Sequence, residues 1–279
     1  MDLSIMNIPL TLINGLITLA FFILAVIYFF LEARVATLAS VRRTLLLSLT
    51  ITLVNIGVIL MTRYIIVFPE SEIYNLNSKI FMIINILTAM FAFFELILYI
   101  RCGQQFAQQK GLAGSSYIRG EGMFSNIDWK LVLIPMPFFF IWTYLVFHFL
   151  DAQPTELVYA LTPVHNDYKT FIYNILNASI LAPLREEIVY RYFAMGLFYR
   201  WFGRGKKAVA INILVTSLIF AFAHSGVIIN DLVKILQILP LGLAFGWIYH
   251  KKGLGNAILS HSIFNTITII ISFVVDAIY

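Results

Sequence analysis

Long apolar runs are the feature that most constrains the fold of this chain. Eight stretches of the 279-residue sequence are dominated by Leu, Ile, Val, Phe and Ala, and about 20 apolar residues let a helix cross a bilayer. The runs do not alternate between apolar and polar residues, as the strands of a membrane barrel would. We therefore predict an all-α fold, a polytopic transmembrane helix bundle with about eight spans. The predicted spans are roughly 9–31, 44–67, 80–100, 131–150, 168–199, 208–224, 228–249 and 254–277.

The overall composition supports an integral multi-pass membrane protein. Hydrophobic residues make up 61% of the chain and charged residues 12%, whereas a soluble domain is about one-quarter charged. The net charge of +5 has no basic cluster interleaved with a polar domain, so we expect no nucleic-acid partner. The single cysteine, Cys102, cannot form an internal disulfide.

Polar residues divide the chain into two parts. Residues 1–150 form a predicted N-terminal transmembrane region of about four spans, with a Gly-, Ser- and Gln-containing linker near 102–130. Residues 168–272 carry the polar motifs and form the predicted catalytic membrane domain. Lys and Arg concentrate in the odd-numbered loops, which predicts that these loops, the linker included, are cytoplasmic.

The fifth span carries charges where a bilayer makes them costly. Glu186, Glu187 and Arg191 lie inside it, and each charge at that depth costs about 2.5–3.5 kcal/mol on insertion scales. Glu187 and Arg191 are four residues apart in the favourable order for an ion pair, so we expect them to neutralise each other. Glu186 points in another direction and is left to act as a base. Pro183 predicts a kink and freed backbone groups just before the pair.

Two later spans add polar residues at helical spacing. His224 follows Phe220 by four residues, and Asn265 follows His261 by four. In one chemistry, Glu186 and His224 activate a water while His261 and Asn265 stabilise an oxyanion. In the other, Glu186, His224 and His261 bind zinc. We favour the metal-free chemistry, with no cofactor, because Asn is a poor zinc ligand and no HExxH motif is present.

These residues resemble the motifs of a known family. EEIVYR (Glu186 to Arg191), FAFAH (Phe220 to His224) and HSIFN (His261 to Asn265) are similar to EExxxR, FxxxH and HxxxN of the CPBP family, the CAAX-protease and bacteriocin-processing (Abi) intramembrane endopeptidases. The resemblance covers roughly residues 168–270. One departure is Tyr192, because the motif arginine is often followed by glycine, which permits close helix packing.

The resemblance implies an Rce1-like fold and a glutamate-dependent protease. It implies that Glu186 activates water with His224, that His261 and Asn265 stabilise the oxyanion, and that Glu187 and Arg191 support them. The implied substrate is a membrane-associated protein or peptide, with or without a lipid anchor. The implied location is a bacterial cell membrane, and the surrounding lipid is the other partner. The oligomeric state stays open.

Two other functions fit the same residues. The chain could be a non-proteolytic partner of the same family, for example in bacteriocin immunity or regulation. It could also be a transporter with Glu186, Glu187 and Glu95 as a proton relay, although the unlike halves speak against transport. A difficulty also remains for the protease, because His224 lies about seventeen residues from its cytoplasmic loop and His261 about seven. At about 1.5 Å per residue this separates them by roughly 15 Å in depth.

Overall fold

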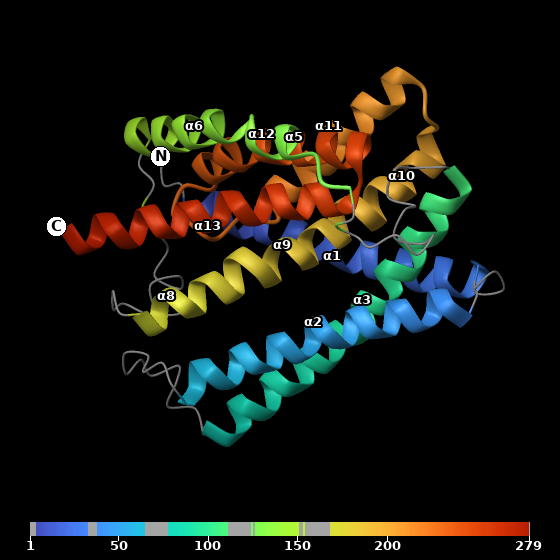
Figure 1. Ribbon diagram of the computed structural model, residues 1–279, viewed down its shortest axis with the longest axis horizontal. Coiled ribbons are helices and arrows are strands. Elements are labelled where there is room, and N and C mark those ends of the chain that lie inside the picture. Colours follow the sequence, from blue (N-terminus) through green and yellow to red (C-terminus); the bar gives the residue numbers. More distant parts are fainter. Residues whose placement is uncertain are drawn as a thin grey trace.

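The computed structural model describes residues 4–32, 38–64, 78–110, 124, 126–150, 153 and 168–278, which form helices and contain no β-strand. The helices (Figure 1) are α1 (Ser4–Glu32), α2 (Leu38–Tyr64), α3 (Ser78–Lys110), α5 (Trp129–Leu133), α6 (Met136–Phe149), α8 (Tyr168–Asn174), η4 (Ile175–Leu181), α9 (Ala182–Glu186), η5 (Glu187–Ala194), α10 (Met195–Phe202), α11 (Lys206–Phe222), α12 (Asp231–Lys252) and α13 (Leu254–Ile278). Each predicted span overlaps one of these helices, except that the fourth overlaps α5 and α6 and the fifth overlaps the run from α8 to α10. Five helices of the described part are long and apolar enough to cross a membrane. The prediction of an all-α, multi-pass membrane bundle is confirmed.

The fifth predicted span is one unbroken helical run with two π-helical segments. The chain passes from α8 through η4, α9 and η5 to α10 without a break. In η4 the backbone widens, and the N–H of Ala182 donates to the carbonyl of Asn177, five residues back. The next donor in that pattern would be Pro183, which has no N–H. Single π turns occur often at functional sites. Here η4 precedes the two adjacent glutamates and η5 begins at Glu187.

The core joins the N-terminal helices to the C-terminal ones. Phe193 of η5 is fully buried, and its ring contacts those of Phe21 in α1 and of Tyr99 and Phe106 in α3, at centroid distances of 5.9, 4.9 and 6.1 Å. Aromatic contacts of this kind stabilise beyond their buried area. Helices α1 and α3 therefore pack directly against the helix that carries the glutamates.

Tyr192 packs closely although it replaces the usual glycine. A Cβ added to Gly103 of α3 would lie 2.6 Å from the ring of Tyr192 and 3.0 Å from its carbonyl oxygen. The small residue that lets the two helices approach therefore stands on α3 instead of after Arg191. The departure from the family motif is compensated on the neighbouring helix.

The predicted third span and linker need a correction of their boundary. We expected the span to end near residue 100 and polar linker to follow, but α3 continues to Lys110. Gln104 is buried, and its Oε1 accepts hydrogen bonds from Thr44 at 3.2 Å and from Arg101 at 3.2 Å. Polar residues such as Gln104, which the sequence assigned to the linker, therefore have hydrogen-bond partners inside the bundle. Residues 111–123 and 125 of the expected linker lie outside the described part of the chain.

Several helix ends gather at one end of the bundle. The Nε1 of Trp201, at the end of α10, donates to the hydroxyl of Tyr28 near the end of α1. Tyr199 bonds His250 near the end of α12, at 2.9 Å. Lys252 forms an ion pair with Asp128 at the start of α5, at 3.0 Å. The C-terminal ends of α1, α10 and α12 thus lie on the same side of the bundle, in agreement with the arrangement that the charge pattern predicts.

Candidate active site

A cavity of about 300 Å³ is bordered by all four predicted catalytic residues, Glu186, His224, His261 and Asn265. They come from three parts of the fold. Glu186 ends α9, His224 follows α11, and His261 and Asn265 both lie on α13. The rest of the wall is mostly apolar and consists of Ala178, Ala182, Phe220, Lys234, Gln237, Ile238, Leu241, Phe245, Phe264, Thr268 and Ile269. The fold therefore places scarce polar groups in a largely apolar pocket.

Glu186 lies between the two imidazoles. Its Oε2 is 3.8 Å from the Nε2 of His224 and 3.8 Å from the Nε2 of His261. The carboxylate side chain is 28% exposed, and Oε2 itself is buried without a hydrogen-bond partner among the described residues. Both imidazoles are therefore at the depth of Glu186, which removes the difficulty raised by the sequence.

His224 reaches that depth because its ring turns back along its own helix. Its Nδ1 lies 2.8 Å from the carbonyl oxygen of Phe220, one helical turn or about 5 Å earlier. Figure 1 also shows the turn between α10 and α11 standing away from the other helix ends, which adds length before His224. A carbonyl oxygen only accepts hydrogen bonds, so Nδ1 carries a hydrogen and Nε2 is the ring atom that faces Glu186.

The turn after α11 is fixed by two hydrogen bonds. The N–H of Gly226 donates to Asp231 Oδ1, at 2.6 Å, and Gly226 has a φ of +82° that favours glycine. The N–H of Ile229 donates to the carbonyl of Gln153 at 2.8 Å. His224 therefore lies on a connection between α11 and α12 that hydrogen bonds hold in place.

Glu187 differs sharply from its neighbour Glu186. It is fully buried, with its Oε2 3.2 Å from the Nε of Arg191 and its Oε1 3.0 Å from the Nδ1 of His261. The predicted ion pair of Glu187 with Arg191 is confirmed. The guanidinium of Arg191 also lies over the ring of Phe220, 4.7 Å from its centroid, where a cation is attracted to the aromatic face.

His261 is held in one orientation by these contacts. Glu187 accepts from its Nδ1, and the ring stacks on Phe245 at 4.8 Å and meets the edge of Phe220 at 5.9 Å. Because Nδ1 is committed to the carboxylate, Nε2 is the atom that faces Glu186. Glu187 is therefore an orienting group for His261, a role that the sequence did not predict.

Asn265 satisfies a carbonyl that the proline leaves free. Its Nδ2 donates to the carbonyl oxygen of Ala178 at 2.6 Å, and Ala178 precedes Pro183 by the five residues of a π turn. The predicted freed backbone group is thus bonded by a neighbouring helix, and the bond ties α13 to η4. An amide has two N–H donors, so one remains for the cavity that Asn265 borders.

The three candidate zinc ligands do not fit a zinc ion as they are placed. Tetrahedral zinc at about 2.0–2.1 Å from its ligands holds them about 3.3 Å apart, whereas Glu186 Oε2 is 3.8 Å from each histidine nitrogen. Within the described residues no group of three His, Cys, Asp or Glu side chains is arranged to hold a metal ion. We derive no step through a metal.

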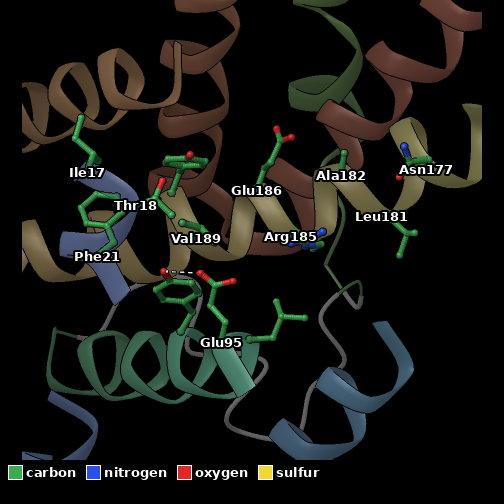
Figure 2. Close-up of a pocket in the computed structure, with 13 residues that line it drawn as sticks. Ile17, Thr18, Phe21, Glu95, Asn177, Leu181, Ala182, Arg185, Glu186 and Val189 are labelled. Carbon is green, nitrogen blue, oxygen red and sulfur yellow. Dashed lines mark hydrogen bonds between the residues drawn. The ribbon is translucent and has the colours of Figure 1, made fainter. Parts of the chain in front are cut away.

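A second cavity, of about 340 Å³, borders Glu186 from the side of the N-terminal helices. Figure 2 shows Glu95 of α3 there, accepting a hydrogen bond from Tyr99 at 3.0 Å, while the Glu186 carboxylate points to the opposite side of its helix. Arg185 also borders this cavity. Glu95 borders this cavity together with Glu186 and lies outside the cavity that holds the histidines.

Lys234 is the residue of the first cavity that the sequence analysis did not select. It lies in the first turn of α12, and its Nζ donates to Gln237 Oε1 at 2.8 Å. A lysine near the start of an apolar span looks like an interfacial residue that reaches for water. Only the packing of α12 against α11 and α13 shows that it borders the pocket of Glu186.

Comparison with known families gives one match. Residues 168–267 match the family described as type II CAAX prenyl endopeptidase Rce1-like. The match begins at the first residue of α8 and ends two residues after Asn265, so it contains every residue that carries the three motifs. No curated protein and no solved structure matches the chain.

Proposed function

The chain belongs to the CPBP family of Rce1-like intramembrane proteases, and from this premise we propose that it is an endopeptidase that uses Glu186 and His224 to activate water. The substrate is a peptide bond of a membrane-associated protein or peptide of the CAAX type. The family supports proteolysis in general terms, and the residue roles rest on the geometry that follows. The membrane is proposed to be a bacterial cell membrane.

The water-activating step follows from the spacing of two acceptors. Glu186 Oε2 and His224 Nε2 are 3.8 Å apart, and one water can donate a hydrogen bond of about 2.8 Å to each. Attack on the carbonyl carbon then transfers one water proton to Glu186. His224 holds the other hydrogen and orients the oxygen lone pair toward the substrate.

The developing oxyanion needs donors on the other side of the cavity. Glu187 holds the Nδ1 of His261, which leaves Nε2 facing the cavity, where it donates to the oxyanion when it carries a hydrogen. Asn265 supplies the N–H that Ala178 does not use. Such donors are effective because they are fixed in place before the reaction and sheltered from water.

The protonated Glu186 then completes the reaction. It passes the proton to the amine of the leaving fragment as the tetrahedral intermediate collapses, and the C–N bond breaks. Glu187 and Arg191 take no part in these transfers. They hold the His261 ring and supply a buried, neutralised pair beside it.

The observation that carries the proposal is the position of Glu186 Oε2, 3.8 Å from both imidazoles inside one cavity. The test is cleavage of a fluorescence-quenched peptide that contains a prenylated cysteine followed by three residues, by the purified protein in liposomes. Wild type is expected to release a product that mass spectrometry locates, and Glu186→Gln is expected to be inactive yet equally well inserted. Equal activity of the two proteins would contradict the proposal.

Zinc chemistry and a non-proteolytic role are separated by the same assay. A zinc enzyme would lose activity with a strong chelator and regain it with added Zn²⁺, whereas the proposed mechanism predicts no change. A protein that acts only by binding would keep its cellular function in Glu186→Gln. Metal analysis of the purified protein gives an independent reading.

A further inference from the structure

Lys234 is a cation in an apolar part of the cavity that the proposed reaction does not use. It is the one Lys or Arg among the described residues that border this cavity. Its neighbours on the wall include Ile238 and Leu241, which cannot solvate a charge. A buried or half-buried ammonium is costly unless it is paired.

The partner of Lys234 within the protein is neutral. Nζ donates to the amide oxygen of Gln237 at 2.8 Å, which occupies one of the three ammonium hydrogens. Glu186 borders the same cavity, but within the described residues no carboxylate lies within ion-pair distance of Lys234 Nζ, and Glu187 is engaged by Arg191 and His261. The cavity therefore offers a held cation without an anion in contact.

Lys234 shares one wall of the cavity with a residue that contacts His261. Lys234, Gln237, Leu241 and Phe245 border the cavity from one face of α12, and Phe245 stacks on His261. A carboxylate held by Lys234 would therefore lie in the same cavity as the reacting groups.

We propose that Lys234 is a specificity-determining residue that binds a carboxylate of the substrate. Gln237 holds the ammonium in place, and the apolar wall receives the neighbouring part of the substrate. The carboxylate is either the C-terminus of the substrate or an acidic side chain. This inference rests on the proposed peptidase function and adds to it which substrates the site accepts.

The experiment compares three versions of the same quenched peptide: a free C-terminal acid, the C-terminal carboxamide, and the carboxamide with Asp as the last residue. For wild type, kcat/KM is expected to be about 10- to 100-fold higher for a carboxylate-bearing peptide than for the plain carboxamide, the range of a hydrogen bond to a charged group. Comparison of the free acid with the Asp peptide distinguishes the two sources of the carboxylate.

Variants then assign the preference to Lys234. In Lys234→Met the acid-to-amide ratio is expected to fall to about 1, and Lys234→Arg is expected to retain part of it. Lys251→Met is the matched control, because Lys251 is exposed at the other end of the same helix, and it should keep the wild-type ratio. A ratio that stays high in Lys234→Met overturns the inference.

Binding separates this inference from the peptidase proposal. Anisotropy of the labelled peptides is measured with Glu186→Gln and with Glu186→Gln combined with Lys234→Met. A carboxylate preference that needs Lys234, seen in binding without any cleavage by wild type, supports recognition and contradicts proteolysis. Cleavage with no preference supports proteolysis and contradicts recognition, and absence of both binding and cleavage contradicts both.

Discussion

The two cavities that meet at Glu186 contain similar residue types but differ in how their charges are arranged. The first surrounds the Glu186 carboxylate with two imidazoles at 3.8 Å and borders Asn265. The second contains Glu95, which accepts a hydrogen bond from Tyr99, and the Glu186 carboxylate points away from it (Figure 2). A carboxylate within a span is therefore not a sufficient sign of reactivity. What distinguishes the first cavity is that two imidazoles, from the turn after α11 and from α13, approach one oxygen of Glu186.

The largest expected effect tests whether the imidazoles make this difference. His224→Ala should lower kcat by about 100- to 10,000-fold, because it removes one of the two groups that hold the attacking water. The measurement is the initial rate at saturating peptide, with insertion and thermal stability checked in parallel. A decrease below tenfold would show that Glu186 acts without His224, and the two cavities would then differ less than proposed.

Removal of the charge on Glu187 should cost stability as well as activity. Glu187→Gln leaves Arg191 as a buried charge without its anion, and loss of one partner of a buried pair costs about 3–5 kcal/mol. The reading is thermal unfolding in detergent, with Glu186→Gln as the matched control, because Glu186 has no ion pair with Lys or Arg in the described structure. Equal melting temperatures for the two variants would contradict the distinction between the neighbouring glutamates.

The close approach of α3 to the glutamate helix predicts a further loss of stability. In Gly103→Ala the new methyl group would lie 2.6 Å from the ring of Tyr192, and overpacking of this kind costs about 1–3 kcal/mol. The double variant Gly103→Ala with Tyr192→Gly tests the pairing of the two positions. If the small residue can stand on either helix, the double variant recovers stability relative to Gly103→Ala, and failure to recover would show that Tyr192 is needed for its own packing.

The second cavity is expected to contribute little to the reaction. Glu95→Gln keeps an oxygen that accepts from Tyr99, so kcat/KM should stay within about threefold of wild type, in contrast to Glu186→Gln. A tenfold or greater decrease would show that the second cavity takes part. The same peptide assay measures both variants.

The smallest predicted effect concerns the end of the bundle. The hydrogen bond from Lys252, together with the N–H of Leu131, lowers the pKa of Asp128 below its ordinary value. The carboxylate therefore stabilises the folded state above the unfolded pKa, near pH 4, and this contribution disappears as the pH falls through the folded pKa. Melting temperatures between pH 5 and pH 3 should decrease slightly less in Asp128→Asn than in wild type, and a steeper decrease in the variant would contradict this sign.

The helices and the membrane environment follow from apolar runs, because a bilayer leaves the backbone few alternatives to a helix. The ion pair of Glu187 with Arg191 was equally predictable, since both residues lie on one helix with fixed spacing. The end of α3 was not, because only contacts with Thr44 and Arg101 show that Gln104 is an interior residue. The π-helical segments were not predicted either, because segments this short leave no periodic signal in a helix that is apolar on most sides.

For the candidate site, the sequence by itself determined which residue types were unusual and which of them share a helix face. It did not determine how three helices align in depth, and simple counting placed His224 and His261 roughly 15 Å apart. The tertiary structure decided that both imidazoles reach Glu186, that Glu187 orients His261, and that Lys234 borders the same cavity. The physical reason is that spacing along a helix is set by local backbone geometry, whereas the relative depth and tilt of helices depend on packing between residues far apart in the chain.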